Sequence, residues 1–419
     1  MESLTSFLSI SADSDFPLSN IPFGVFHLKT ETESQARCAS RLGNFVIDLA
    51  ALFASGMLIL QSTKTNVFQM PTLNDFISLE NKEWSYVRGQ LQTLFKSDSK
   101  LSCEDPMQKY VFKLEDCVIK LPVHVGDYTD FYSSKNHAIN VGTMFRGPEN
   151  ALKPNWTWLP VGYHGRASSI VVSPSEFKRP SGQVKPRDKD VPHFAKSNKV
   201  DFELEMVTVV GRNNKIGEPV SIDNAADHIF GYLLMNDVSI RDVQAWEYIP
   251  LGPFTGKNCI TVVSAWIVTA EALEPFRTEL PKQDPAPLEY LNDKNYSSYN
   301  IPLEVHLQTE KMTSPQLLAT SNMKYLYWTP TQQLTHHTVT GCNLQVGDML
   351  GSGTISGTDK SEYGSFLELS WNGKEEIQMK ETSETRTFWS DNDTLIIKGH
   401  AQKGNLRIGF GECTTTLLP

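Results

Sequence analysis

The chain has 419 residues, enough for two domains with cores of their own, and its 21% charged and 40% hydrophobic residues are typical of a globular protein. A formal net charge of −10 argues against nucleic acid or an anionic membrane as partner, because both require a basic surface. The sequence has neither an apolar run of membrane-spanning length nor the pattern of a signal peptide, so we expect no membrane association.

Residues 1–119 are predicted to form a small N-terminal domain without a catalytic constellation. Short strands are expected at 23–27 and 44–48, the second followed directly by a helix at 49–53. Apolar residues at helical spacing predict a longer helix over 75–95.

Polar, glycine and aromatic residues cluster densely from residue 121 onward, within the second predicted domain, 120–419. The run G-D-Y-T-D-F-Y at 126–132 leads into a predicted helix over 133–143, with Asp130 as its N-cap. His137 follows Asp130 by seven residues, about two helical turns, so both side chains are expected on the same side. A hydrogen-bonded structural histidine is the alternative to a catalytic base.

The stretch D-F-E-L-E at 201–205 alternates carboxylates with apolar residues, as a β-strand does. Period two places Asp201, Glu203 and Glu205 on one face, where like charges repel unless a cation lies between them. A divalent cation with oxygen ligands would remove this repulsion. The alternative is a solvated outer face of an antiparallel strand.

A nearly continuous apolar run at 229–235 predicts a strand buried on both faces, which ends at an acid. A helix predicted to start there carries four polar residues on one face: Asp237, Arg241, Gln244 and Tyr248. Such a stripe is typical either of a solvated helix face or of a site built at a strand end. The loop that follows, rich in proline and glycine, delivers Lys257.

The C-terminal third contributes strands and one well-marked helix. T-P-T-Q at 329–332 is a capping box with proline at the first helical position, which predicts a helix through Val339. Strands are expected at 303–307, 367–371, 394–400 and 406–410. The glycine-rich segment 346–357 lacks the spacing of a phosphate loop or a dinucleotide site, which argues against nucleotide binding.

The candidate ligands are carboxylates and not thiols or imidazoles. The six cysteines have no paired short spacing, which predicts reduced thiols in a cytoplasmic protein and excludes a typical zinc site. An all-oxygen site favours Mg²⁺ or Ca²⁺. The residues alone therefore indicate a metal-dependent enzyme that acts on a small, oxygen-rich anion.

These clusters resemble the fumarylacetoacetate hydrolase family, and the N-terminal segment together with G-D-Y-T-D-F-Y-S-S at 126–134 is similar to its fumarylacetoacetase branch. The other motifs that carry the resemblance are M-F-R-G at 144–147, L-P-V-G-Y-H-G-R at 159–166, E-L-E at 203–205, and the segments 248–257, 332–337 and 352–357.

The resemblance implies an α+β, β-rich fold: a small N-terminal SH3-like barrel domain (1–119) and a larger mixed β-roll catalytic domain (120–419). It implies a homodimer that hydrolyses a carbon–carbon bond of 4-fumarylacetoacetate, a small diketo dicarboxylate, to fumarate and acetoacetate, with a metal-bound β-diketone and a water activated by histidine. This is the last step of tyrosine and phenylalanine degradation. The alternatives are an acylpyruvate hydrolase or decarboxylase of the same superfamily, and a non-catalytic metal-binding dimer.

The resemblance also implies residue roles. The implied metal ligands are Asp130, Glu203, Glu205 and Asp237, with Lys257 and Thr261 lining the metal site. The implied catalytic residues are His137 as general base, Glu368 as the carboxylate that orients it, and Arg146, Gln244 and Lys257 as oxyanion stabilisers. The implied substrate contacts are Tyr132, Arg146, Tyr163, Gln244, Tyr248 and Thr354.

Several positions stand apart from these matches, among them Asn258, Cys259 and Ala265, which differ from the usual family residues. Asp201 matches no ligand position and is expected to be peripheral. Val238 stands where the family usually has tryptophan, and Ile260 where it usually has glycine.

Overall fold

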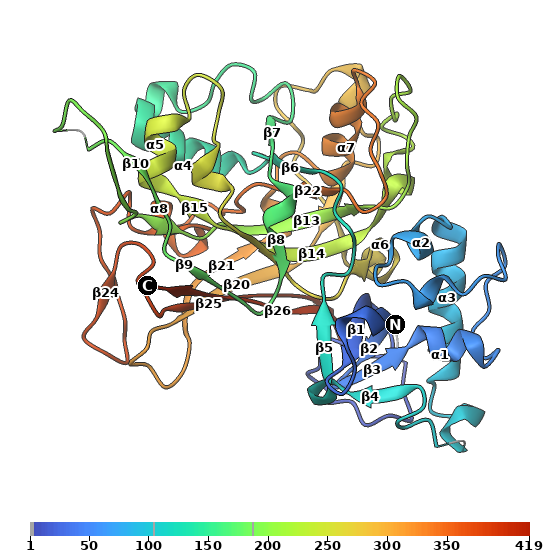
Figure 1. The fold of residues 1–419 in the computed structure, drawn as a ribbon. Helices are drawn as coiled ribbons and strands as arrows, with labels where there is room; N and C mark the ends of the chain where they lie inside the picture. The colour runs from blue at the N-terminus through green and yellow to red at the C-terminus, as the bar shows by residue number, and fades with distance from the viewer. Residues whose placement is uncertain (1–3, 104, 187) are drawn as a thin grey trace.

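The computed structural model describes residues 4–103, 105–186 and 188–419 (Figure 1). A small N-terminal part, blue in Figure 1, lies to one side of a larger part built on two sheets. This arrangement confirms the predicted α+β, strand-rich class with a small N-terminal β domain. None of the helices in the described part of the chain has the length and apolarity that a bilayer crossing requires.

The N-terminal part is a five-stranded antiparallel sheet in the order β4-β3-β2-β1-β5. Its strands are β1 (Phe23–Leu28), β2 (Arg37–Leu42), β3 (Phe45–Asp48), β4 (Val111–Lys113) and β5 (Cys117–Lys120). Its helices are α1 (Leu49–Ala54), α2 (Asn74–Ile77) and α3 (Asn81–Leu94). Asp48 ends β3 and caps α1 by accepting the backbone N–H of Ala51 (2.9 Å), which confirms the predicted transition from strand to helix.

The helix predicted over 75–95 is divided into α2 and α3. Glu80 takes a φ of +71°, in the left-handed region, so the chain cannot continue as one helix through this position. The apolar spacing survives the break, since Phe76 and Trp84 both remain buried. Their rings pack against Phe230 of the larger part, at centroid distances of 6.2 and 5.0 Å. The two parts therefore share one hydrophobic cluster.

The sheet that carries the candidate site has the order β7-β6-β22-β13-β14-β16-β8, with β17 paired to β14. Its strands are β6 (Tyr128–Phe131), β7 (Gly162–His164), β8 (Ile170–Val172), β13 (Leu204–Val210), β14 (Ile229–Asp237), β16 (Thr261–Val263), β17 (Val268–Thr269) and β22 (Met349–Gly351). The sheet is mixed: β22 pairs with β6, and β16 with β8, in parallel, while the other pairs are antiparallel.

A second sheet, in the order β21-β20-β25-β26-β9, packs beneath the first in the view of Figure 1 and encloses the main hydrophobic core with it. Its strands are β9 (Ser175–Lys178), β20 (Pro302–Gln308), β21 (Gln316–Asn322), β25 (Thr394–Lys403) and β26 (Leu406–Leu418). Short two-stranded pairs complete the strands: β10 (Ser181–Val184) with β11 (His193–Lys196), β12 (Val200–Asp201) with β15 (Ser239–Ile240), β18 (Arg277–Glu279) with β19 (Ser297–Tyr299), and β23 (Ile377–Gln378) with β24 (Thr385–Arg386).

The helices of the larger part are α4 (Lys135–Arg146), α5 (Arg241–Glu247), α6 (Ala270–Leu273), α7 (Pro330–Thr338) and α8 (Phe366–Leu369). The capping box predicted for α7 is confirmed, with Thr329 as N-cap and Gln332 returning to it. The predicted N-cap of α4 is wrong: Ser134 caps this helix, and Asp130 lies in β6. Asp130 is thus placed by a strand, and not by the first turn of a helix.

Two further expectations for local structure are wrong. The strand predicted over 367–371 is replaced by the short helix α8. The hydroxyl of Ser365 accepts the backbone N–H of Glu368 and caps this turn, and the apolar side chains of the turn are buried. The helix predicted to begin at Asp237 begins at Arg241, because Asp237 is still paired in β14 and β15 follows it.

Candidate active site

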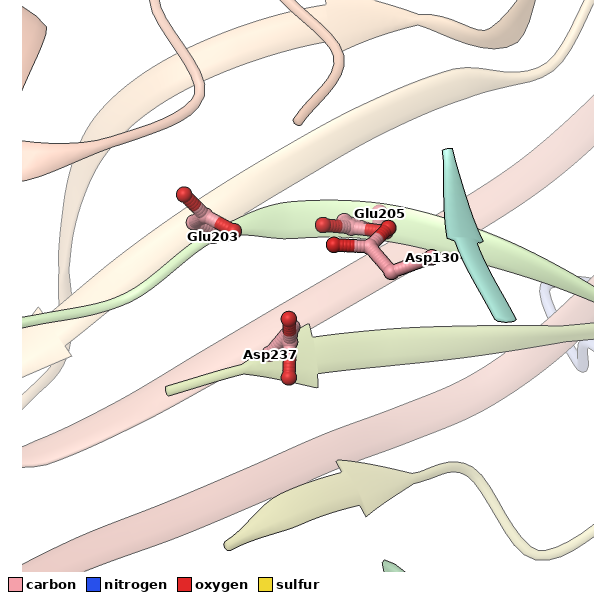
Figure 2. A group of neighbouring side chains, drawn as sticks. All are labelled: Asp130, Glu203, Glu205 and Asp237. Atoms are coloured by element: carbon pink, nitrogen blue, oxygen red, sulfur yellow. The ribbon is translucent and has the colours of Figure 1, made fainter. Parts of the chain in front are cut away.

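Four buried carboxylates converge over the central sheet (Figure 2). One ligand oxygen from each of them lies within 4.8 Å of the others, and all four residues are at most 5% exposed. They come from β6, from β13 and the residue before it, and from the end of β14: Asp130, Glu203, Glu205 and Asp237. The convergence expected for a metal site is therefore present, and the solvated strand face is excluded.

The strand pairing explains how residues far apart in sequence meet. The backbone N–H of Asp237 donates to the carbonyl of Glu203 (3.3 Å), which fixes these two acids side by side. Asp130 has to reach across β22, where Gly351 is its paired residue. A Cβ on Gly351 would lie 3.1 Å from Asp130 Oδ1 and 2.8 Å from the methyl carbon of Met235, closer than normal packing permits.

Two cations, the buried Lys257 and the partly buried Arg241, lie against the cluster. The ammonium of Lys257 contacts the carboxylates of Glu203 and Asp237 and donates to Ser239 Oγ (3.0 Å). The guanidinium of Arg241 donates to the other oxygen of Glu203 (2.8 Å). Glu203 is therefore paired on both oxygens, as a buried carboxylate requires.

The pKa values of the four acids move in opposite directions for this reason. Burial raises the pKa of Glu205 and Asp130 well above the ordinary range, and the neighbouring carboxylates raise it further. Burial acts in the same sense on Glu203, but Lys257 and Arg241 outweigh it and hold its pKa far below the usual value. Burial would lower the pKa of Lys257, but Asp237 and Glu203 raise it, so the ammonium stays charged.

The donor atoms fit a hard divalent cation. Asp130 Oδ1 and Glu205 Oε1 are buried and have no hydrogen-bond partner among the described residues, although buried oxygens are normally paired. The second oxygen of Glu205 accepts the backbone N–H of Gly353 (2.9 Å), and Thr261 Oγ1 donates to Asp237 Oδ1 (2.6 Å). Oxygen donors fixed in this way could hold a cation that takes oxygen ligands, which would displace protons from the three acids of raised pKa, Asp130, Glu205 and Asp237.

A buried histidine–carboxylate pair forms the second half of the site. His137 Nδ1 lies 2.7 Å from Glu368 Oε2, and both side chains are at most 3% exposed. Glu368 also accepts hydrogen bonds from Asn140, Ser356 and Ser365, at 2.8–3.0 Å. Burial would raise the pKa of Glu368, but the adjacent His137 imidazole and the hydrogen bonds from His137, Asn140 and Ser365 lower it, so it stays an anion.

The orientation of the imidazole follows from this pair. An ionised Glu368 only accepts hydrogen bonds, so Nδ1 carries the proton that it donates. In the neutral imidazole the other ring nitrogen, Nε2, is then the proton acceptor, which is the state that a general base requires. The ring of Tyr132 packs edge-on against the imidazole, with centroids 5.3 Å apart.

Three of the expected substrate contacts lie beside the acidic cluster or are buried near it. Tyr163 pairs with Asp130 in β7, and its hydroxyl lies 3.5 Å from Asp237 Oδ2. Thr354 is buried, and its hydroxyl has no partner among the described residues. Gln244 accepts a hydrogen bond from Arg241 Nη1 (3.2 Å).

The structure shows no hydrogen bond from the other two expected substrate contacts, Arg146 and Tyr248, to the described carboxylates of the acidic cluster. Arg146, at the end of α4, donates to the carbonyls of Asn150 and Ala151 in its own exit loop, at 3.1 and 2.6 Å. Tyr248 is 40% exposed at the end of α5. Arg146 is therefore held by its own loop in this structure, and Tyr248 is open to solvent.

Two residues of this site were not predicted from the sequence. Arg241 was assigned only to a polar helical stripe, yet it contacts Glu203 and Gln244. Asp201, expected to be peripheral, is fully buried and pairs with Arg241 (2.8 Å). Their charges were the signal in the sequence that could have identified them. Asp201 and Glu203 are two acids at an i, i+2 spacing, which need a cation beside them when buried, and Arg241 follows the end of the strand at Asp237 by four residues.

Two of the departures from the family pattern, Val238 and Ile260, belong to the hydrophobic core. Val238 is fully buried and Ile260 is 7% exposed, and both pack in the main cluster between the sheets. Valine at 238 is smaller than the usual tryptophan, and isoleucine at 260 is larger than the usual glycine. Both keep the core apolar and filled.

Comparison with known proteins places this geometry in a family. Residues 19–122 match the family model described as fumarylacetoacetase N-terminal, and residues 128–418 match the one described as fumarylacetoacetate (FAA) hydrolase C-terminal. Fumarylacetoacetase of Dictyostelium discoideum is 48% identical over 100% of this chain and 99% of its own length. Fumarylacetoacetase of Homo sapiens is 47% identical over 99% of both chains.

Solved structures share the fold at much lower identity. Fumarylacetoacetate hydrolase from Exiguobacterium antarcticum aligns with 95% of this chain and 99% of its own at a TM-score of 0.52 and 18% identity. Maleylpyruvate hydrolase from Sphingobium sp. SYK-6 aligns with 95% of this chain and 99% of its own at a TM-score of 0.50 and 15% identity. The two family matches and the full-length relatives lead to one conclusion: this chain belongs to the fumarylacetoacetate hydrolase family.

Proposed function

We propose that this chain hydrolyses a carbon–carbon bond of 4-fumarylacetoacetate, a step of tyrosine and phenylalanine degradation, and releases fumarate and acetoacetate. The observations that carry the proposal are the convergence of four buried carboxylates and the buried His137–Glu368 pair. The two are linked because Ser365, which donates a hydrogen bond to Glu368, forms a β-bridge with Glu203. Relatives that are 48% and 47% identical over essentially the whole chain are fumarylacetoacetases, which supports the choice of substrate.

The histidine pair accounts for the activation of water. Glu368 holds the Nδ1–H of His137, so Nε2 is free to take a proton from a water molecule as its oxygen attacks the carbonyl carbon of the fumaryl side. When the carbon–carbon bond breaks, the hydroxyl remains on the fumaryl carbonyl and makes it a carboxyl group. The electron pair goes to the acetoacetate carbon, which takes up a proton.

The negative charge that develops on the attacked carbonyl oxygen needs preorganised positive or hydrogen-bonding groups. We assign this role to Lys257, Gln244 and Arg146. Lys257 is suited to it because burial and two carboxylates fix its ammonium in place. The residues that we assign to substrate contacts are Tyr132, Arg146, Tyr163, Gln244, Tyr248 and Thr354.

The residues proposed to hold Mg²⁺ or Ca²⁺ are Asp130, Glu203, Glu205 and Asp237, with Lys257 and Thr261 lining the site. When bound, such a cation polarises the oxygens of the β-diketone as a Lewis acid.

Product analysis tests the reaction. The purified protein, supplied with Mg²⁺, is expected to convert fumarylacetoacetate to fumarate and acetoacetate in equal amounts. Formation of pyruvate from an acylpyruvate, or release of CO₂, without turnover of fumarylacetoacetate would instead identify an acylpyruvate hydrolase or decarboxylase. Binding of metal and diketo acid without any turnover would identify a non-catalytic metal-binding dimer.

Removal of metal tests the cofactor. Dialysis against a chelator is expected to abolish turnover, and addition of Mg²⁺ or Ca²⁺ is expected to restore it, because several kcal/mol of transition-state stabilisation depend on the cation. Elemental analysis of the protein before dialysis would identify the resident ion. An unchanged rate after complete chelation would contradict the metal assignment.

Three further assignments belong to the same proposal. We place the domain boundary near residue 120, where β5 ends, in agreement with family matches that end at residue 122 and begin again at residue 128. We propose a homodimer, which sedimentation equilibrium can measure. A cytoplasmic location agrees with six free cysteines.

A further inference from the structure

We propose that Asp201 is a positioning residue that holds the metal-ligand half and the histidine half of the site in one geometry. This inference rests on the proposed function, because the reaction there uses both halves. Asp201 lies at the end of β12, two residues before Glu203, and its side chain is fully buried. Its two oxygens receive three hydrogen bonds, which lead in two directions.

The first direction leads to the acidic cluster. Asp201 Oδ2 accepts a hydrogen bond from Arg241 Nε (2.8 Å). The guanidinium is planar and rigid, so a fixed Nε also fixes the two terminal nitrogens. Nη2 donates to Glu203 Oε1 (2.8 Å), and Nη1 donates to Gln244 Oε1 (3.2 Å). One carboxylate thus sets the position of a proposed metal ligand and of a proposed oxyanion stabiliser.

The second direction leads to the general base. Asp201 Oδ1 accepts the backbone N–H of Phe366 (2.7 Å), and Oδ2 accepts that of Leu367 (3.0 Å). These are the first two residues of α8, a helix too short to be stable by itself. The next residue is Glu368, which holds His137 at 2.7 Å. A shift of this turn would move the imidazole away from the water that it deprotonates.

The number of donors explains why a carboxylate is needed at this position. Three donors face Asp201, and an ionised carboxylate accepts at both oxygens. An asparagine of the same shape has one acceptor oxygen, and its amide would turn two hydrogens toward donors. Asp201→Asn must therefore break the contact with Arg241 or the contact with the start of α8, so one half of the site shifts relative to the other.

Steady-state kinetics of three variants tests this role. Asp201→Asn is expected to lower kcat by about 10- to 100-fold, the effect typical of residues that orient a metal ligand or a base. KM is expected to change less, because Asp201 contacts no proposed substrate position. Asp201→Glu keeps the charge and both oxygens and is expected to recover part of kcat.

The matched control is Asp242→Asn, one residue after Arg241 in α5. Asp242 accepts hydrogen bonds from Ser197 Oγ (2.6 Å) and the backbone N–H of Asn198 (2.9 Å), away from the acidic cluster and from α8. Its substitution is expected to lower the melting temperature while kcat stays at the wild-type value. Wild-type kcat in Asp201→Asn, or a loss of kcat in both Asp→Asn variants that follows their loss of stability, would overturn the inference.

A crystal structure of Asp201→Asn, or of Asp201→Glu if the first variant does not fold, gives a readout that does not depend on turnover. We expect a displacement of the Arg241 guanidinium or of residues 366–368 relative to the wild type. Unchanged positions of both would overturn the inference. Absence of turnover in the wild type would contradict the proposed function and leave this structural comparison intact.

Discussion

His137→Ala is expected to lower kcat by about 10²- to 10⁴-fold, the contribution typical of a general base. The reason is geometric: the imidazole is buried, and its Nδ1 is occupied by Glu368, so only Nε2 is available to accept a proton from water. Binding of the diketo acid is expected to persist, because the proposed substrate contacts lie on other side chains. Stopped-flow measurement of kcat and calorimetric titration of the substrate onto the inactive variant separate the two effects.

A second buried histidine serves as the control. His228 is 8% exposed, and its Nδ1 contacts the backbone carbonyl of Arg212 (2.9 Å), outside the acidic cluster. His228→Ala is expected to lower the free energy of unfolding and to leave kcat unchanged. Turnover retained in His137→Ala, or lost equally in both variants, would show that the base has been assigned wrongly.

Local signals in the sequence predicted much of this structure. The apolar run at 229–235 identified β14, and the capping box at Thr329 identified α7. The alternating run at 201–205 is divided between the end of β12, the bridge residue Glu203 and the start of β13, so only its last two residues belong to a strand of the site's sheet. The alternation alone pointed to Asp201, Glu203 and Glu205, and the family resemblance selected Asp130, Glu203, Glu205 and Asp237 as the ligand set. The family resemblance added what local patterns do not contain, above all the pairing of His137 with Glu368 across 231 positions of the chain.

Where local reasoning failed, a long-range contact determines the structure. The alternation at 367–371 is typical of a strand, but Ser365 and Asp201 satisfy the first N–H groups of a helical turn there. Asp201 matches no ligand position of the family, and the partners that give it a role lie 40 and 165 residues away in the chain. Asp130 resembled an N-cap because the strand that positions it, β22, comes more than 200 residues later.

Glu205→Gln is expected to change activity and stability in opposite directions. Loss of one metal ligand should lower kcat by about 10³-fold or more, since several kcal/mol of transition-state stabilisation come from the cation and each 1.4 kcal/mol is a factor of ten. In the metal-free protein, however, Glu205 is a buried acid beside Asp130 and Asp237, and its Oε1 has no partner among the described residues. A glutamine keeps an oxygen for the N–H of Gly353 and turns its amide toward the neighbouring carboxylates.

The free energy of unfolding of the metal-free variant should therefore rise by about 1 to 3 kcal/mol, the cost of an unsatisfied buried polar group that the substitution removes. Glu83→Gln is the matched control. Glu83 is also a buried glutamate, but its two oxygens accept the backbone N–H groups of Gln61 and Ser62 at 2.8 and 2.9 Å. There the new amide would face a donor, so stability should fall while kcat is unchanged.

Denaturant unfolding in the presence of a chelator, together with kcat measured with Mg²⁺, gives both quantities for both variants. Opposite signs of the stability change at Glu205 and Glu83 would mean that the acidic cluster is maintained against the stability of the fold, as expected of a site built for a cation and not for structure. A Glu205→Gln protein that is less stable than the wild type without metal, or that keeps its kcat, would contradict that interpretation of the four carboxylates.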